Sequence, residues 1–154
     1  MKPGISTVAA LAVLACLSAR AEPAAQHAAG AFDVKMSPAS APQHEGRTAT
    51  GRMLLEKQYS GELQASGKGE MLTAMTDTKG SAAYVAIERI TGTLNGKAGS
   101  FVVQHAGTMR GGDSQLAVTI VPDSGSGELS GISGRMSLKQ VDRKHRYEID
   151  YVLP

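Results

Sequence analysis

The chain has no Trp, two Phe and four Tyr, so that aromatic residues make up only 4% of its 154 residues. Its hydrophobic core must therefore be built mainly from Val, Ile, Leu, Met and Ala. Extended basic runs are also absent, and the longest basic cluster, residues 143–146, has no aromatic residues interleaved with it. Proteins that bind nucleic acid usually carry a basic face with aromatic or motif signals, so this composition argues against nucleic-acid binding.

Helical periodicity is lacking as well. Outside the N-terminal segment, no stretch repeats its apolar residues with the spacing of an amphipathic helix. The 18 Gly residues are too many for a helical bundle and follow no collagen-like period, which indicates many tight turns. The length is that of one domain.

The N-terminus has the three parts of a secretory signal. Lys2 supplies a short positive region, residues 5–17 form an apolar run, and residues 19–21 (Ala-Arg-Ala) match the small-x-small pattern of a cleavage site. We therefore predict a signal peptide at 1–21, a mature start at Glu22, and a periplasmic or secreted protein. The alternative is a buried N-terminal helix. The run is too short for a permanent membrane span, which needs about 20 residues.

Cys16 is the only cysteine, and it lies inside this predicted signal. Residues 13–16 (Val-Leu-Ala-Cys) resemble a bacterial lipobox, so the alternative is a lipoprotein anchored to the membrane through Cys16. Cleavage after Ala21 would instead leave no cysteine, and hence no disulfide and no thiol catalysis. It would also remove Lys2 and Arg20, leaving as many basic residues as the 14 acidic ones.

From Gly51 onward, β-rich runs alternate with Gly-containing breaks. After a flexible segment at 22–30 we place the domain at 31–154, with strands at 31–36, 52–59, 63–76, 82–94, 100–109, 115–121, 132–141 and 147–153. About eight strands with short connections predict an all-β fold, a small closed antiparallel barrel. The alternative is a β-sandwich, which would need longer crossover loops than this chain offers.

Asn95-Gly96 is the strongest turn signal, because a two-residue hairpin turn requires positive φ at both positions. If these two residues form the turn, Glu88 faces Val103 and Ala86 faces His105 on the next strand. Side chains alternate across a sheet, so Glu88 and His105 become diagonal neighbours on one otherwise apolar face. The residues beside them on that face include Tyr84, Phe101 and Met109.

The pairing of Glu88 with His105 is the main candidate site. If their face lines the barrel interior, the carboxylate and the imidazole titrate as a coupled pair. They could orient a ligand or move a proton, or they could be a purely structural pair. Glu70 could join them from the neighbouring strand. We predict ligand-binding residues at Glu88, His105, Glu70, Tyr84, Phe101 and Met109, no metal site and no cofactor.

Three long runs carry a family resemblance: KGEMLTAM, KGSAAYVAIERITGTLNGKAGSFVVQHAGTM and VPDSGSGELSGISGRMSL, followed by the terminal YEIDYVLP. Over about residues 30–154 the chain resembles the bacterial domain of unknown function 3224 family. The resemblance implies a lipocalin-like barrel similar to that of the allene oxide cyclases, and no established activity. The family positions that match are Glu70, Glu88, His105, Asp123 and Glu128. Many members look cytoplasmic, so the export signal is a departure, and no catalytic motif of the cyclases is recognisable.

Three hypotheses for function follow. The first is a binding module that holds a small apolar or amphipathic molecule in the barrel, oriented by Glu88 and His105. The second is a protein-interaction or homodimeric structural role. The third is an isomerase- or cyclase-like enzyme that uses the same Glu–His pair for proton transfer.

Overall fold

The computed structural model describes residues 23–154, so the predicted signal peptide and Cys16 lie outside the described residues. Every regular element in this range is a β-strand, and no helix here is long and apolar enough to cross a bilayer. The strands are β1 (Ala25–Pro38), β2 (Gln43–Glu45), β3 (Thr48–Gly61), β4 (Leu63–Thr76), β5 (Ala82–Leu94), β6 (Lys97–Arg110), β7 (Asp113–Ile120), β8 (Ser126–Gly127), β9 (Ser133–Val141) and β10 (Lys144–Val152).

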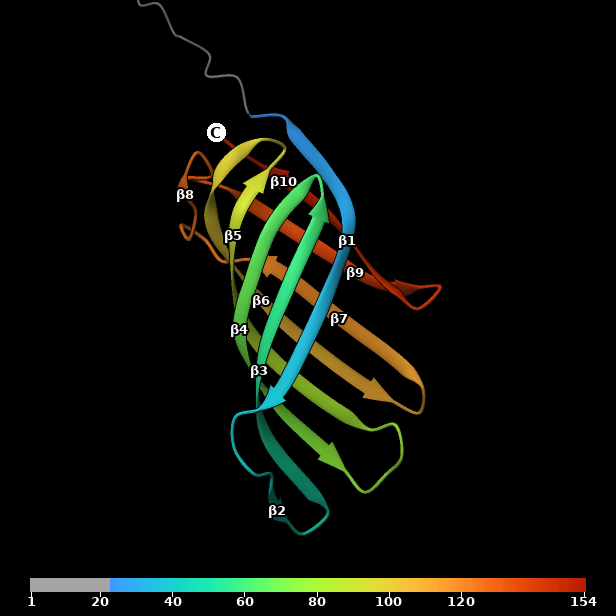
Figure 1. The fold of residues 1–154 in the computed structure, drawn as a ribbon. Coiled ribbons are helices and arrows are strands. Elements are labelled where there is room, and N and C mark those ends of the chain that lie inside the picture. Colours follow the sequence, from blue (N-terminus) through green and yellow to red (C-terminus); the bar gives the residue numbers. More distant parts are fainter. Residues whose placement is uncertain (1–22) are drawn as a thin grey trace, which may run out of the picture.

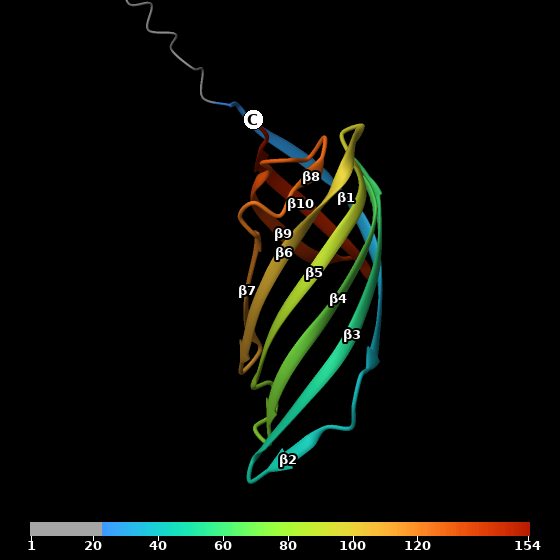
Figure 2. The ribbon, with the colours of Figure 1, turned by 90° about the vertical axis from the view of Figure 1, so that its left-hand side faces the viewer.

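Eight of these strands close into an antiparallel barrel in the order β1-β10-β9-β7-β6-β5-β4-β3, and β1 also pairs with β3 to complete the circle. The two short strands lie outside the circle, with β2 on the edge of β3 and β8 against β6. Figures 1 and 2 show the long, twisted strands curling round a common axis. The prediction of a closed antiparallel barrel is confirmed, and the sandwich alternative is wrong.

The N-terminal strand begins earlier than the sequence indicated. Residues 22–30 were predicted to be flexible, yet β1 starts at Ala25 and pairs with β10 from Ala25 to Phe32. Alanine and glycine have low β-propensity, and here long-range pairing overrides that local preference. Small residues are required at this seam: a side chain at Gly30 would collide with the Ser60 carbonyl and the Tyr147 ring.

The β5–β6 hairpin has the predicted geometry. Asn95 and Gly96 both have positive φ, 48° and 80°. Ala86 lies opposite His105 and Glu88 opposite Val103, as the turn required. The face that carries Glu88 and His105 points into the barrel, since both residues are buried while Val85 and Ile87 are exposed.

One end of the barrel is filled by side chains. This filled end lies near the Asn95-Gly96 turn and holds Tyr59, Leu63, Ile90, Leu94, Phe101, Leu129, Ile132, Tyr147, Ile149 and Tyr151. The Tyr147 hydroxyl accepts a hydrogen bond from the Leu63 amide (2.8 Å) and donates to the Ser60 carbonyl (3.1 Å). Three of the four tyrosines in the chain thus concentrate the scarce aromatic residues at this end.

The opposite end is open. There β7 and β9 pair only at Val118–Met136 and Thr119–Arg135, and β1 leaves β10 beyond Phe32. The β6–β7 and β9–β10 hairpins therefore diverge, as the right-hand side of Figure 1 shows. The strands splay around a mouth that no described segment closes.

Candidate functional site

Four buried side chains form one hydrogen-bonded group inside the barrel, which we call the Glu88 cluster: Lys57, Tyr59, Glu88 and His105. Oε2 of Glu88 accepts from Nζ of Lys57 (2.7 Å) and lies 3.0 Å from Nε2 of His105. Oε1 accepts from the Tyr59 hydroxyl (2.8 Å). Glu88 is 0% exposed, and its carboxylate meets two donors from β3 and one from β6.

Strand alternation explains how these residues meet. Leu55, Lys57 and Tyr59 point inward from β3, as Ala86 and Glu88 do from β5. Between them, β4 has Gly67, where a Cβ atom would collide with Oε1 of Glu88. The missing side chain leaves the space through which Lys57 and Tyr59 reach the carboxylate from two strands away.

The charge of the cluster follows from its hydrogen bonds. Burial by itself would raise the pKa of the Glu88 carboxyl, but the donors of His105, Lys57 and Tyr59 outweigh it and hold the pKa below its ordinary value. Burial and the neighbouring carboxylate raise the pKa of the Tyr59 hydroxyl, which stays protonated. At neutral pH, Glu88 is therefore an anion that only accepts hydrogen bonds.

An ionised Glu88 determines the tautomer of His105. Since the carboxylate can only accept, the ring nitrogen beside it, Nε2, must carry the proton. In the neutral imidazole the other nitrogen, Nδ1, is then an unprotonated acceptor. No residue in 23–154 hydrogen-bonds to Nδ1, and no unpaired side-chain nitrogen or oxygen in that range is sealed from solvent. Nδ1 therefore opens onto the cavity that His105 lines.

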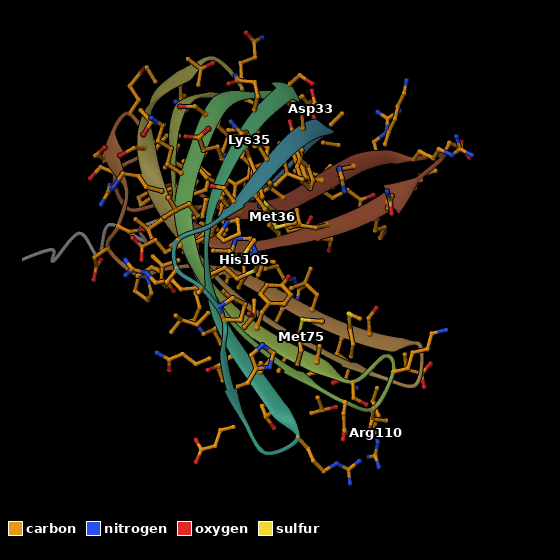
Figure 3. All side chains as sticks on the ribbon, turned by 60° about the horizontal axis from the view of Figure 1, so that its bottom comes forward. Asp33, Lys35, Met36, Met75, His105 and Arg110 are labelled. Carbon is orange, nitrogen blue, oxygen red and sulfur yellow. The ribbon has the colours of Figure 1, made fainter. Side chains whose placement is uncertain are left out.

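That cavity occupies the open end and has a volume of about 510 Å³. Its lining is mainly aliphatic and thioether side chains, with no Asp or Glu among the described residues: Phe32, Val34, Met36, Leu55, Lys57, Met71, Thr73, Met75, Ala82, Ala83, Tyr84, Ala86, His105, Gly107, Met109, Leu116, Leu138, Lys139, Gln140 and His145. In Figure 3, which brings this end forward, His105 lies inside the ring of strands between Met36 and Met75. A drug-sized ligand fits a cavity of this volume.

Among the other predicted site residues, Tyr84 and Met109 line this cavity. The Tyr84 ring covers Gly107 on the paired strand, where a Cβ would collide with it. Met109 lies at the rim and is 49% exposed. Phe101 shares the inward face but lies deeper, in the core of the filled end, and does not line the cavity.

The expectation that Glu70 joins Glu88 and His105 was wrong. Glu70 pairs with Ile87 in the β4–β5 register and so points outward with it. Its carboxylate accepts two hydrogen bonds from Arg52, at 2.9 and 2.7 Å, on the outer surface. Gly69, one residue earlier, occupies the inward position opposite Glu88.

Sequence reasoning missed Lys57 and Tyr59. A signal was present: the run Leu55, Lys57, Tyr59 places a lysine in phase with apolar residues on an inward strand face. Lys57 is only 8% exposed, and its ammonium also lies 5.1 Å from the centre of the Phe32 ring. A buried lysine needs a partner, so its position in the alternation could have led to Glu88.

Groups of three or more His, Cys, Asp or Glu side chains suited to a metal ion do not occur in the described range 23–154. His27 lies on the outer surface, where its Nδ1 is 2.9 Å from the Asp150 carboxylate. His145 stacks on Phe32 with ring centres 5.0 Å apart, at the cavity rim.

Comparison with known proteins finds a family and a solved structure that this barrel resembles. Residues 28–151 match the family described as "Protein of unknown function (DUF3224)". The chain belongs to the DUF3224 family. A crystal structure of a DUF3224 protein of unknown function from Shewanella oneidensis is similar at 45% identity, with a TM-score of 0.81, over 85% of this chain and 98% of that one. The resemblance seen in the sequence is thus confirmed. No curated protein matches.

Proposed function

We propose that this DUF3224 barrel binds one small amphipathic molecule through its open end. The observation that carries the proposal is an apolar cavity in whose wall the imidazole of His105, held at Nε2 by Glu88, leaves Nδ1 unpaired. Ligand sites typically combine an apolar lining with a few converging polar groups that set orientation. The apolar body of the ligand would lie against Val34, Leu55 and Leu138, and a hydroxyl-type donor would face Nδ1 of His105.

The methionines support binding of a flexible or variable apolar body. All six methionines in residues 23–154 lie on inward-facing positions, and four of them line the cavity: Met36, Met71, Met75 and Met109. Methionine side chains are unbranched and polarisable, so they adapt to ligands of different shape. A core that needed only to be filled would use stiffer branched residues, as the opposite end does.

The test uses an environment-sensitive apolar dye, N-phenyl-1-naphthylamine, with two matched tryptophan variants. Met71→Trp places a large ring in the cavity, whereas Leu72→Trp places it on the outer face, where Leu72 is 57% exposed. Wild type and Leu72→Trp should bind the dye equally, and Met71→Trp should bind it at least about tenfold more weakly, a difference of ~1.4 kcal/mol. Equal binding by all three, or none by wild type, would contradict the proposal.

A second candidate is a homodimer formed through the outer face of β4 and β5. Three exposed apolar side chains, Leu72, Val85 and Ile87, line one hollow there, with Lys68, Glu70 and Arg89 around them. Charges of both signs at the rim allow a second copy, turned about a two-fold axis, to meet this face without like-charge repulsion. Light scattering tests it: wild type should have the mass of a dimer and Ile87→Lys that of a monomer.

A further inference from the structure

We propose that His105 is a proton acceptor toward bound molecules, so that the cavity supports proton transfer from a weakly acidic C–H or O–H group. This inference rests on the proposed ligand cavity and adds chemistry to it. Its basis is the geometry of the Glu88 cluster, in which one imidazole nitrogen is held by a carboxylate and the other opens onto an apolar space.

Each end of the imidazole has a distinct role. On the inner side, Glu88 accepts the Nε2 proton, which keeps the Nδ1 lone pair directed to the cavity and stabilises the imidazolium that forms when Nδ1 takes a proton. A buried carboxylate bonded to a histidine is the arrangement that orients a general base. His105 would touch the reacting group, and Glu88 would act through it as a positioning residue.

Lys57 and Tyr59 hold the Glu88 carboxylate ionised and in position beside His105. Lys57 donates to the same Oε2 atom that His105 contacts, and Tyr59 donates to Oε1. The ammonium of Lys57 forms an ion pair with the carboxylate and so compensates its buried negative charge. The charged or titratable groups around His105 are the bonded residues of the Glu88 cluster and three others that line the cavity, namely Tyr84, Lys139 and His145.

The lone pair on Nδ1 of His105 faces the cavity even though the residue as a whole is buried. His105 is 2% exposed and Ala86, the residue opposite it, has too small a side chain to cover it. On the next strand Met71 lies in the same row and also lines the cavity. A base in such an apolar wall meets substrate without competing hydration, which strengthens its interaction with the acidic hydrogen.

The test uses a probe whose only chemical requirement is an accessible base in an apolar pocket, 5-nitrobenzisoxazole. The base removes the ring C–H proton, that electron pair forms the nitrile, the N–O bond breaks, and the coloured phenolate is the leaving group. The proton on Nδ1 then passes to solvent, so the reaction needs no oxidant or cofactor. Phenolate formation is followed by absorbance, and probe binding is measured separately by displacement of N-phenyl-1-naphthylamine.

Wild type should turn the probe over at least about 100-fold faster than His105→Gln, the usual size of a general-base contribution, with similar probe binding. Glu88→Gln should lower kcat more than it raises KM. The outward-facing control Gln104→Ala should match wild type. Because His105→Gln could disturb folding, a second measurement uses wild type alone: decanol, which competes for the cavity, should inhibit turnover in proportion to the dye it displaces.

Two results would overturn the inference in distinguishable ways. If wild type binds the probe but is no faster than His105→Gln, or if decanol displaces the dye without slowing turnover, His105 is not a proton acceptor and the binding function stands. If wild type binds neither the probe nor the dye, the ligand cavity itself is refuted, and the proton-transfer role falls with it.

Discussion

The two ends of this barrel differ in how their inward-facing positions are filled, although the side chains alternate along the strands in the same way at both. At the filled end, tyrosines, Phe101 and branched residues interlock around the Tyr147 hydroxyl, and every large side chain is buried. At the open end, the inward positions carry methionines, alanines and glycines, and Met75 remains 59% exposed. One end is built to hold the barrel closed, whereas the other leaves space, and the Glu88 cluster lies between them.

The largest effect that separates the two ends is expected from truncation of core side chains. Phe101→Ala should lower the free energy of unfolding by about 3–5 kcal/mol, because the fully buried ring leaves a cavity that rigid neighbours cannot fill. Met75→Ala should change it by no more than about 0.5 kcal/mol, since the side chain is already exposed. Urea unfolding of both variants measures the contrast. Similar losses would show that the open end is packed like the filled end.

The next largest effect on stability is expected from substitutions in the Glu88 cluster. Lys57→Met removes the ammonium and leaves a buried carboxylate without its cationic partner, which should cost about 3 kcal/mol of unfolding free energy at neutral pH. Adding Glu88→Gln should restore much of that loss, because the buried charge that lacked a counter-ion is gone. If the double variant is less stable than Lys57→Met by the full effect of Glu88→Gln, the two residues are not coupled.

The pH dependence of that variant follows from the direction of the Glu88 shift. In wild type the folded pKa is lowered below the unfolded value, so ionised Glu88 stabilises the fold above its ordinary pKa, and this stabilisation is lost as the pH falls through the lowered value. The gap between wild type and Lys57→Met should therefore shrink in acid, where the carboxylate is protonated. A gap that stays constant from neutral to acid pH would mean that Glu88 is not the group responsible.

A smaller effect is expected at the glycine that makes room for the cluster. Gly67→Ala should cost about 2 kcal/mol, because the new methyl group displaces the Glu88 carboxylate and strains its bonds to Lys57 and Tyr59. The matched control is Gly51→Ala on β3, where the nearest atom is the movable Thr73 hydroxyl at 3.0 Å. Thermal melts should show a clear loss for Gly67→Ala only. Equal melting temperatures for Gly67→Ala and Gly51→Ala would mean that the Glu88 carboxylate does not lie against Gly67.

The smallest effect belongs to the outer surface. Arg52→Gln removes the exposed ion pair with Glu70, and the unfolding free energy should fall by less than about 1 kcal/mol. Dye binding should be unchanged, because neither residue lines the cavity at the open end. Weakened binding in Arg52→Gln would mean that Glu70 belongs to the site after all.

These contrasts also explain which features the sequence could predict. The Asn95-Gly96 turn has one compatible geometry, so it determines the β5–β6 register and places Glu88 and His105 on one face. The β3–β4 connection includes Gly61 at positive φ and an irregular step, and no simple rule carries the register across it. Lys57 and Tyr59, two strands from Glu88, could therefore not be positioned. Glu70 was assigned to the wrong face because the loop between β4 and β5 does not reveal the register that pairs Glu70 with Ile87.

Long-range closure was equally hard to foresee. Ala25–Gly30 has the composition of a flexible segment, and it forms a strand because β10, far along the chain, supplies its partners. The open end, too, arises where β7 and β9 diverge after pairing at two positions. The export signal stays a prediction, since residues 1–21 lie outside the described range.

The most direct test of this account is the protonation state of each nitrogen of His105. Long-range ¹H–¹⁵N NMR of ¹⁵N-histidine-labelled protein, assigned with His105→Gln, distinguishes the two neutral tautomers. The account predicts that at mildly alkaline pH Nε2 is protonated and Nδ1 is not, and that decanol shifts the Nδ1 resonance. A proton on Nδ1 with Nε2 unprotonated, or a resonance that decanol leaves unmoved, would contradict it.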